Sequence, residues 1–280
     1  MSTTSTEQAK PYSELITVTP DLAQQMLAKM APNRQLRQPV VEAYKRDFLA
    51  GKWLIAESIK LDREGRLIDG HHRLQMCVQL DQPFETFVTY NLDPRAMEVI
   101  DTNAVRKTAD VLKMSGHLNT TTLAATLRIG VLIENGLLTD TGGLKTGGGQ
   151  YRQTHNEELD FLQRNPDLVE AVNGFTQAAR KVKMATSSYT YGAWVLRRVD
   201  EAAFQEFSDA MVQKATEGIG DPRLTLLDYC DQMQRQALRM GVGEALYLLF
   251  TAWNTWRDGK TLRKLTPFIG ENPRPIPEPR

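Results

Sequence analysis

The stretch Gly65-Arg66-Leu67-Ile68-Asp69-Gly70-His71-His72-Arg73-Leu74 joins a short strand pattern to a helix pattern through one glycine. Apolar residues continue at helical spacing as far as Leu80. Backbone N–H groups at a helix N-terminus point at bound anions, and a glycine lets a phosphate approach the backbone closely. Arg73 adds a permanently charged, planar group. The stretch predicts an anion-binding turn, although an ordinary Asp-Gly turn with exposed histidines is the simpler alternative.

Strand and helix patterns surround this turn. Residues 59–61 and 67–68, separated by a turn, predict a hairpin, and residues 84–90 alternate as a further strand. Helices are expected from Thr19, whose hydroxyl can cap the chain before a proline, and from Pro39. The order of these patterns predicts a mixed α/β domain.

Helical patterns dominate after about residue 117, where the strand signals fade. They cover residues 123–138, 157–164, 168–183, 202–216, 224–239 and 244–258. Five glycines between Thr141 and Gln150 predict a flexible loop, without the residue order of a Walker phosphate loop. The proline-rich end from Asn272 cannot continue a helix and is expected to be extended along the surface or disordered.

The fold class predicted from these patterns is α+β, in a chain of 280 residues that is long enough for two domains. The expected parts are a flexible arm at 1–13, an α/β domain at 14–116, an all-α domain at 117–271 and a proline-rich tail at 272–280. The 34 basic and 34 acidic residues cancel, so DNA binding would need a local patch.

The two cysteines, Cys77 and Cys230, lie inside apolar helical patterns without zinc-site spacing, which favours buried structural thiols. The N-terminal residues are polar, and no run of about 18 apolar residues occurs. These features predict a cytoplasmic protein that does not bind or span a membrane.

Residues 67–76, LIDGHHRLQM, resemble the phosphate-binding signature of the ParB/sulfiredoxin superfamily. In that signature a strand, a glycine, two variable polar residues, an arginine and a helix recur. Gly70 and Arg73 match its two fixed positions.

Two further segments resemble the same domain. Asn103-Ala104-Val105-Arg106 resembles an Asn-x-x-Arg turn of ParB that helps to hold metal and triphosphate. The loop with Arg34 and Arg37 resembles the basic early loop of that domain, so the similarity spans about residues 15 to 112. The helical second half does not resemble a ParB DNA-binding domain.

The resemblance implies an N-terminal ParB/sulfiredoxin-like domain that binds a nucleoside triphosphate, CTP or ATP, with Mg²⁺. The chain would then act on or at DNA as an NTP-dependent switch, with a homodimer as one option. The nucleotide-binding residues implied are Gly70, His71, His72, Arg73, Asn103, Arg106, Arg34 and Arg37. Asn103 and Asp69 are the implied metal ligands, unless Asp69 instead orients His72.

Departures from the family pattern narrow the function. His71 occupies the position of the catalytic cysteine of sulfiredoxin, and an imidazole cannot form the thiosulfinate intermediate, which argues against that activity. The acidic residue precedes the glycine as Asp69, whereas ParB has a glutamate after it, so cytidine specificity is not indicated. The Asp-Gly-x-His-Arg form is closer to relatives associated with DNA modification.

Two rival functions remain open. The first is an NTPase, phosphotransferase or nuclease of the same superfamily, with Asp69, His71 and His72 as catalytic residues and Asp69 or His71 as general base. The second is a DNA-binding regulator or adaptor that has kept the fold and lost nucleotide affinity.

The helical half offers two features that could contact nucleic acid. Its basic residues cluster at 180–183, 197–198 and 257–264, where a phosphate-binding surface and an ordinary solvated face are equally good interpretations. Trp253 and Trp256 share helical spacing with Leu246, Leu249 and Phe250, which favours core packing over base stacking.

Overall fold

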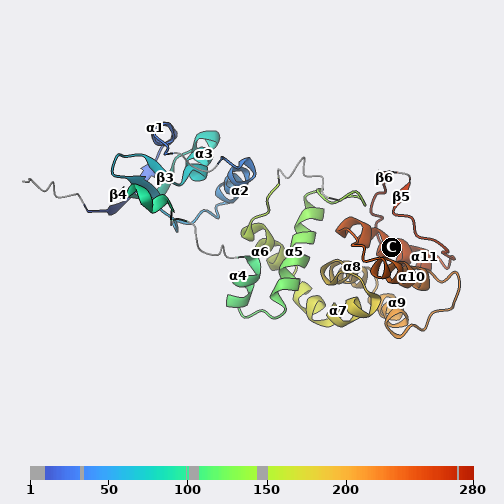
Figure 1. The fold of residues 1–280 in the computed structure, drawn as a ribbon. Helices are drawn as coiled ribbons and strands as arrows, with labels where there is room; N and C mark the ends of the chain where they lie inside the picture. The colour runs from blue at the N-terminus through green and yellow to red at the C-terminus, as the bar shows by residue number, and fades with distance from the viewer. Residues whose placement is uncertain (1–9, 32–34, 99, 101–106, 144–150, 270) are drawn as a thin grey trace, which may run out of the picture. The chain divides into compact units, whose positions relative to one another are not determined.

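The computed structural model describes residues 10–31, 35–98, 100, 107–143, 151–269 and 271–280. The chain divides into two compact units, residues 1–105 with 147–156 and residues 106–146 with 157–280 (Figure 1). The first unit is mixed α/β and the second is mainly helical, as the sequence predicts.

The first unit is built on a four-stranded sheet. Its elements are β1 (Tyr12–Val18), α1 (Pro20–Ala28), α2 (Gln38–Leu49), β2 (Ile59–Asp62), β3 (Leu67–Asp69), α3 (His71–Leu80), β4 (Phe84–Leu92) and the 3₁₀ helix η1 (Pro94–Glu98). The strand order is β1-β4-β2-β3; β4 runs antiparallel to β1 and parallel to β2, and β2 and β3 form the expected hairpin.

Helices α1, α2 and α3 lie on one face of this sheet (Figure 1). The core between them contains Val18, Ala23, Met26, Val41, Ile59, Leu61, Leu67, Leu74, Met76, Cys77, Phe84 and Val88. On the opposite face, Leu15 and its register partner Phe87 are exposed. Burial on one face explains the alternation that predicted β4.

Strand β1 corrects the expectation of a flexible arm as far as residue 13. Tyr12 already pairs with Tyr90 on β4, and their rings stack with centroids 5.0 Å apart. The hydroxyls of Ser13 and Thr89 lie 2.8 Å apart. These contacts come from a segment more than 70 residues away, which local sequence patterns do not reveal.

The rest of the chain is mainly helical. Its elements are α4 (Thr108–Met114), α5 (Thr120–Glu134), α6 (His155–Arg164), α7 (Leu168–Val182), α8 (Thr186–Val199), α9 (Glu201–Gln213), α10 (Pro222–Arg235), α11 (Val242–Arg257), β5 (Phe268–Ile269) and β6 (Asn272–Pro273). The boundary differs from the expected residue 116 because α4 packs against α5 in the second unit.

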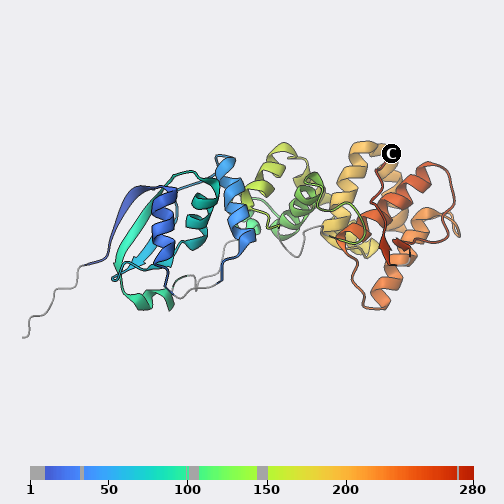
Figure 2. The same ribbon diagram turned by 90° about the horizontal axis from the view of Figure 1, so that it is seen from above.

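Helix α8 was not expected, although it packs against α5, α7, α9 and α11 and is central to the helical unit (Figure 2). It buries the polar residues Ser188 and Thr190 as well as apolar ones, so its sequence shows no clear apolar stripe. The Tyr189 hydroxyl lies 3.1 Å from that of Ser208 on α9.

Two expectations for the helical half are confirmed, and one falls partly outside the described residues. The tail after Asn272 is extended, and Leu246, Leu249, Phe250 and Trp253 are buried while Trp256 is half-buried. The glycine-rich loop lies outside the described residues from 144 to 150. Among the described helices, none is long and apolar enough to cross a membrane.

Candidate anion-binding site

Gly70 joins β3 to α3 in a left-handed conformation, with a φ of 105°. A Cβ on Gly70 would lie 3.0 Å from Cγ1 of Ile59, so both the dihedral angle and the packing against β2 favour glycine. The Gly70 carbonyl accepts the N–H of Arg73 at 3.0 Å, and Gly70 itself has no side chain with which to cap α3. The positive end of the α3 dipole is therefore at this turn.

Arg73, expected to supply a charged group to the turn, instead points into the unit and supports its structure. The residue is 9% exposed, and its two terminal nitrogens donate to the carbonyls of Glu57 at 2.6 Å and Ser58 at 2.9 Å. Side chains on the first turn of a helix lean back toward its N-terminus. Arg73 consequently reaches the chain that enters β2 and ties it to α3.

Asp69 forms an ion pair that sequence reasoning missed. Lys60 lies opposite Asp69 in the β2–β3 register, and its ammonium is 2.6 Å from Oδ2 of Asp69. The same oxygen is 3.5 Å from a terminal nitrogen of Arg73. Lys60 alternates with buried Ile59 and Leu61, a pattern that could have placed it on the same face as Asp69.

The two histidines have different surroundings. His71 is only 6% exposed, which corrects the alternative in which both histidines are exposed turn residues. His72 is half-buried, and its Nε2 accepts the backbone N–H of Arg37 at 3.1 Å. The two imidazole rings are adjacent, with centroids 3.9 Å apart. His72 thus links the start of α3 to the start of α2.

Arg37 is exposed, and within the described residues its guanidinium makes no hydrogen bond or ion pair. Of the expected basic loop, the structure brings the backbone of Arg37 to the first turn of α3 through His72. Arg34, Asn103 and Arg106 lie outside the described residues.

The described part of the site does not fit Mg²⁺. Oδ2 of Asp69 already contacts Lys60 and Arg73, and a metal ion there would be placed next to two positive charges. Among the described residues, no cluster of three or more His, Cys, Asp or Glu side chains could hold a metal. Asn103, the other implied ligand, is outside them.

A cavity of about 410 Å³ lies in the helical unit, apart from the predicted site residues. It is lined by Ala125, Arg128, Ile129, Leu132, Leu138, Gly143, Ser187 and Val242. The lining is largely apolar and contains none of the residues predicted to bind nucleotide.

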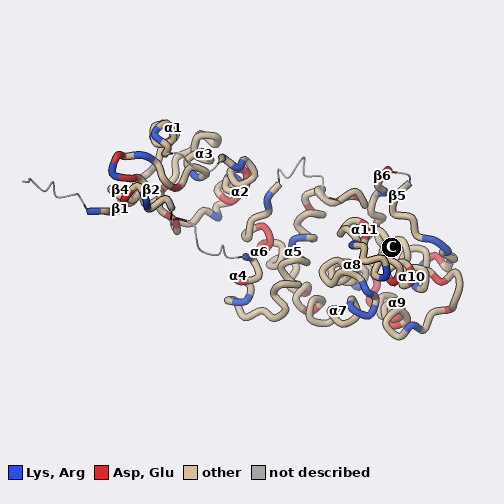
Figure 3. The backbone as a smooth tube through the Cα atoms, in the orientation of Figure 1, with Lys and Arg blue, Asp and Glu red and all other residues tan. Residues whose placement is uncertain are grey.

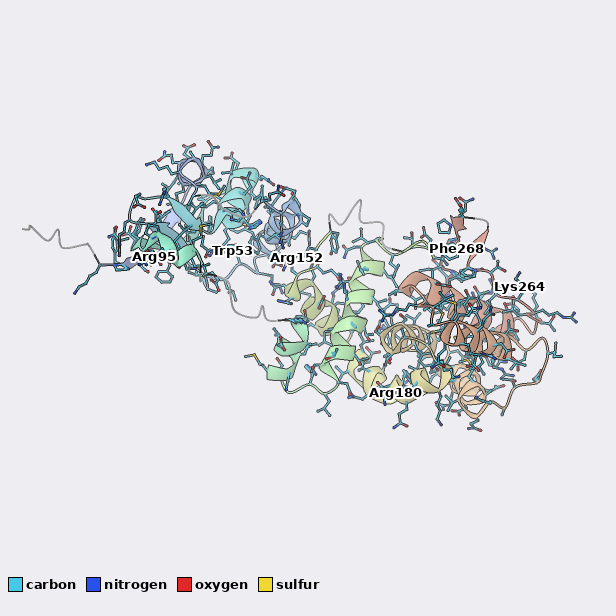
Figure 4. All side chains as sticks on the ribbon, in the orientation of Figure 1. Trp53, Arg95, Arg152, Arg180, Lys264 and Phe268 are labelled. Atoms are coloured by element: carbon cyan, nitrogen blue, oxygen red, sulfur yellow. The ribbon has the colours of Figure 1, made fainter. Side chains whose placement is uncertain are left out.

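The basic clusters of the helical unit are mostly neutralised. Acidic partners lie within 4.0 Å of Lys183, Arg197, Arg198, Arg257 and Lys260. Figure 3 shows basic and acidic positions interleaved along α7 to α11. Arg180 and Lys264 extend away from the ribbon (Figure 4). This distribution favours a solvated face over one continuous phosphate-binding surface.

Comparisons with known proteins add little to this geometry. No protein-family model matches the sequence, and no curated protein matches it. A search of solved structures found similarity to a Pnob8-like ParB-N domain, with 12% identity over 81% of this chain and 98% of that chain. The TM-score is 0.22.

Proposed function

We propose that this chain binds a nucleoside triphosphate through its phosphates at the Gly70 turn, and that it acts at DNA as an NTP-dependent switch. The observation that carries the proposal is the start of α3 at a left-handed glycine, with the backbone of the exposed residue Arg37 bonded to His72 on the first turn of that helix. Helix N-termini and arginine side chains both favour phosphate oxygens. The resemblance of residues 67–76 to ParB/sulfiredoxin domains supplies the nucleotide and DNA context.

The residues have distinct roles in this proposal. The backbone around Gly70 and His71 faces the phosphates, and Arg37 neutralises their charge. His72 positions Arg37 by accepting its backbone N–H. Arg73 positions the turn from inside, through the carbonyls of residues 57–58. The described residues would not ligate Mg²⁺, which would enter already bound to the nucleotide.

The geometry favours binding over the rival enzymatic function. A general base needs an accessible acceptor, but the Asp69 carboxylate contacts two cations and His71 is 6% exposed. Turnover of nucleotide or cleavage of DNA by the purified protein would support the enzyme instead. A regulator without nucleotide affinity would show no thermal shift with any NTP and Mg²⁺.

The test is equilibrium binding of CTP, ATP, GTP and UTP by calorimetry, with and without Mg²⁺. Losing one charge-assisted contact costs about 1.5–3 kcal/mol, so Arg37→Ala is expected to weaken binding at least about tenfold. Arg180→Ala, an exposed arginine of the helical unit, is the matched control and should bind as the wild type does. Equal affinity of Arg37→Ala and the wild type would reject the site.

A further inference from the structure

Residues 278–280 are held by side chains that contact their backbone. On α11, Asn254 donates its amide to the Glu278 carbonyl at 2.8 Å, and its Oδ1 accepts the N–H of Arg280 at 3.0 Å. The indole N–H of Trp253 donates to the Arg280 carbonyl at 2.9 Å. The side chains of Asn254 and Trp253 thus form hydrogen bonds with three backbone groups of an extended segment.

The preceding part of the tail is held by the segment after α5. The N–H of Thr141 donates to the Arg274 carbonyl at 2.9 Å, and the N–H of Arg274 donates to the Thr141 hydroxyl at 2.9 Å. The N–H of Ile276 donates to the Thr139 carbonyl at 2.9 Å. Asp140 and Pro275 form an antiparallel bridge between these contacts. The pattern resembles the addition of one short strand.

Two arginine side chains of the tail add specificity. Arg274 donates to the hydroxyl of Tyr247 at 2.8 Å. Arg280 lies 2.8 Å from the carboxylate of Asp258 at the end of α11. Pro275, Pro277 and Pro279 lie between these two arginines; they keep the segment extended and lower the entropy cost of binding it.

Burial is unequal on the two sides of this contact. Trp253, Asn254, Tyr247 and Thr141 are all at most 8% exposed. No residue of the tail from 271 to 280 is fully buried. The tail is therefore attached mainly through polar contacts, and segments with few buried apolar groups open at low free-energy cost.

We propose that α11 and residues 139–141 form a binding groove for an extended, proline-rich segment, and that the tail of a second copy of this chain can replace the tail bound in cis. This proposal is independent of nucleotide binding. Asn254 and Trp253 would form hydrogen bonds with the backbone of the incoming segment, and Asp258 would pair with the Arg280 of that segment. A tail bound in cis has an effective concentration in the millimolar range, so ligands of low affinity cannot displace it from the groove.

The test uses the full chain with a released tail. Arg274→Ala combined with Arg280→Glu removes both arginine contacts and places a negative charge beside Asp258. A fluorescent, C-terminally amidated peptide of residues 272–280 should then bind at least about tenfold more tightly than to the wild type. Addition of Asn254→Ala to the released-tail chain should abolish this binding. A folded released-tail chain that binds no peptide would overturn the proposal.

Hydrogen exchange of the wild-type chain provides a second test that needs no folded variant. The hydrogen-bonded amides of Arg274, Ile276 and Arg280 should exchange at least about a hundredfold faster than the central amides of α11, because the tail opens by itself. Exchange of both sets at one common rate would mean that the tail opens only with the helical unit. That result would also overturn the proposal.

Discussion

Replacement of Arg73 by alanine should destabilise the first unit. The change removes two hydrogen bonds from a charged donor to the carbonyls of Glu57 and Ser58. Glu57 keeps a bond from the Thr86 hydroxyl at 3.1 Å, whereas the Ser58 carbonyl loses its arginine partner. Hydrogen bonds to charged groups contribute about 1.5–3 kcal/mol each, and with partial relaxation we expect a loss of about 2–4 kcal/mol.

The measurement is urea unfolding followed by hydrogen exchange of peptides from residues 12–92, because a chain with two units need not unfold in one step. Arg73→Lys should recover less than half of the loss, since one ammonium cannot match the two donors of a guanidinium. Arg37→Ala, in the same unit and exposed, is the control and should unfold within about 0.5 kcal/mol of the wild type. Wild-type stability of Arg73→Ala would refute the structural role given to this arginine.

Three further predictions follow from burial and backbone geometry. Burial opposes the ionisation of Asp62, but hydrogen bonds from Arg66 outweigh it and hold the pKa of Asp62 below its ordinary value. The ionised Asp62 stabilises the fold fully above about pH 4, and this stabilisation is lost as the pH falls through the folded-state pKa. The difference in urea unfolding midpoint between the wild type and Asp62→Asn should therefore disappear below about pH 4. Burial raises the pKa of Cys77 to about 11 and that of Cys230 to about 12. Iodoacetamide at pH 8 should therefore alkylate the native chain at least about a hundredfold more slowly than the unfolded chain. Equal alkylation rates would contradict the burial of both thiols. Gly70→Ala should cost about 1–3 kcal/mol in thermal unfolding because its φ is 105°, and an unchanged midpoint would show that the turn tolerates a side chain.

Local sequence signals predicted most of the secondary structure. Thr19 accepts the N–H of Leu22, and Pro20 occupies the first turn, so α1 begins where the capping pattern places it. The β2–β3 hairpin and the glycine before α3 are also signalled by residues close to them in the sequence. Such elements can be predicted because their start signals and their apolar periodicity lie within one short stretch of sequence.

The elements that sequence reasoning missed depend on distant partners. Strand β1 is fixed by pairing with β4, and α8 buries hydroxyl groups such as that of Tyr189 against helices on several sides. The Lys60–Asp69 ion pair depends on strand register. A sequence pattern does not give the register between strands or the number of helices around a central one.

The Gly70–Arg73 motif has two separate physical explanations, and they concern different residues. Gly70 meets a conformational need beside Ile59, and Arg73 ties α3 to the chain before β2, so both residues serve the fold without any ligand. Phosphate binding instead depends on groups that the fold leaves accessible, of which the exposed guanidinium of Arg37 is the clearest. If the turn is a binding site, loss of Arg37 should lower affinity at constant stability. Loss of Arg73 should lower both, because the bound phosphates require a turn that is already in place.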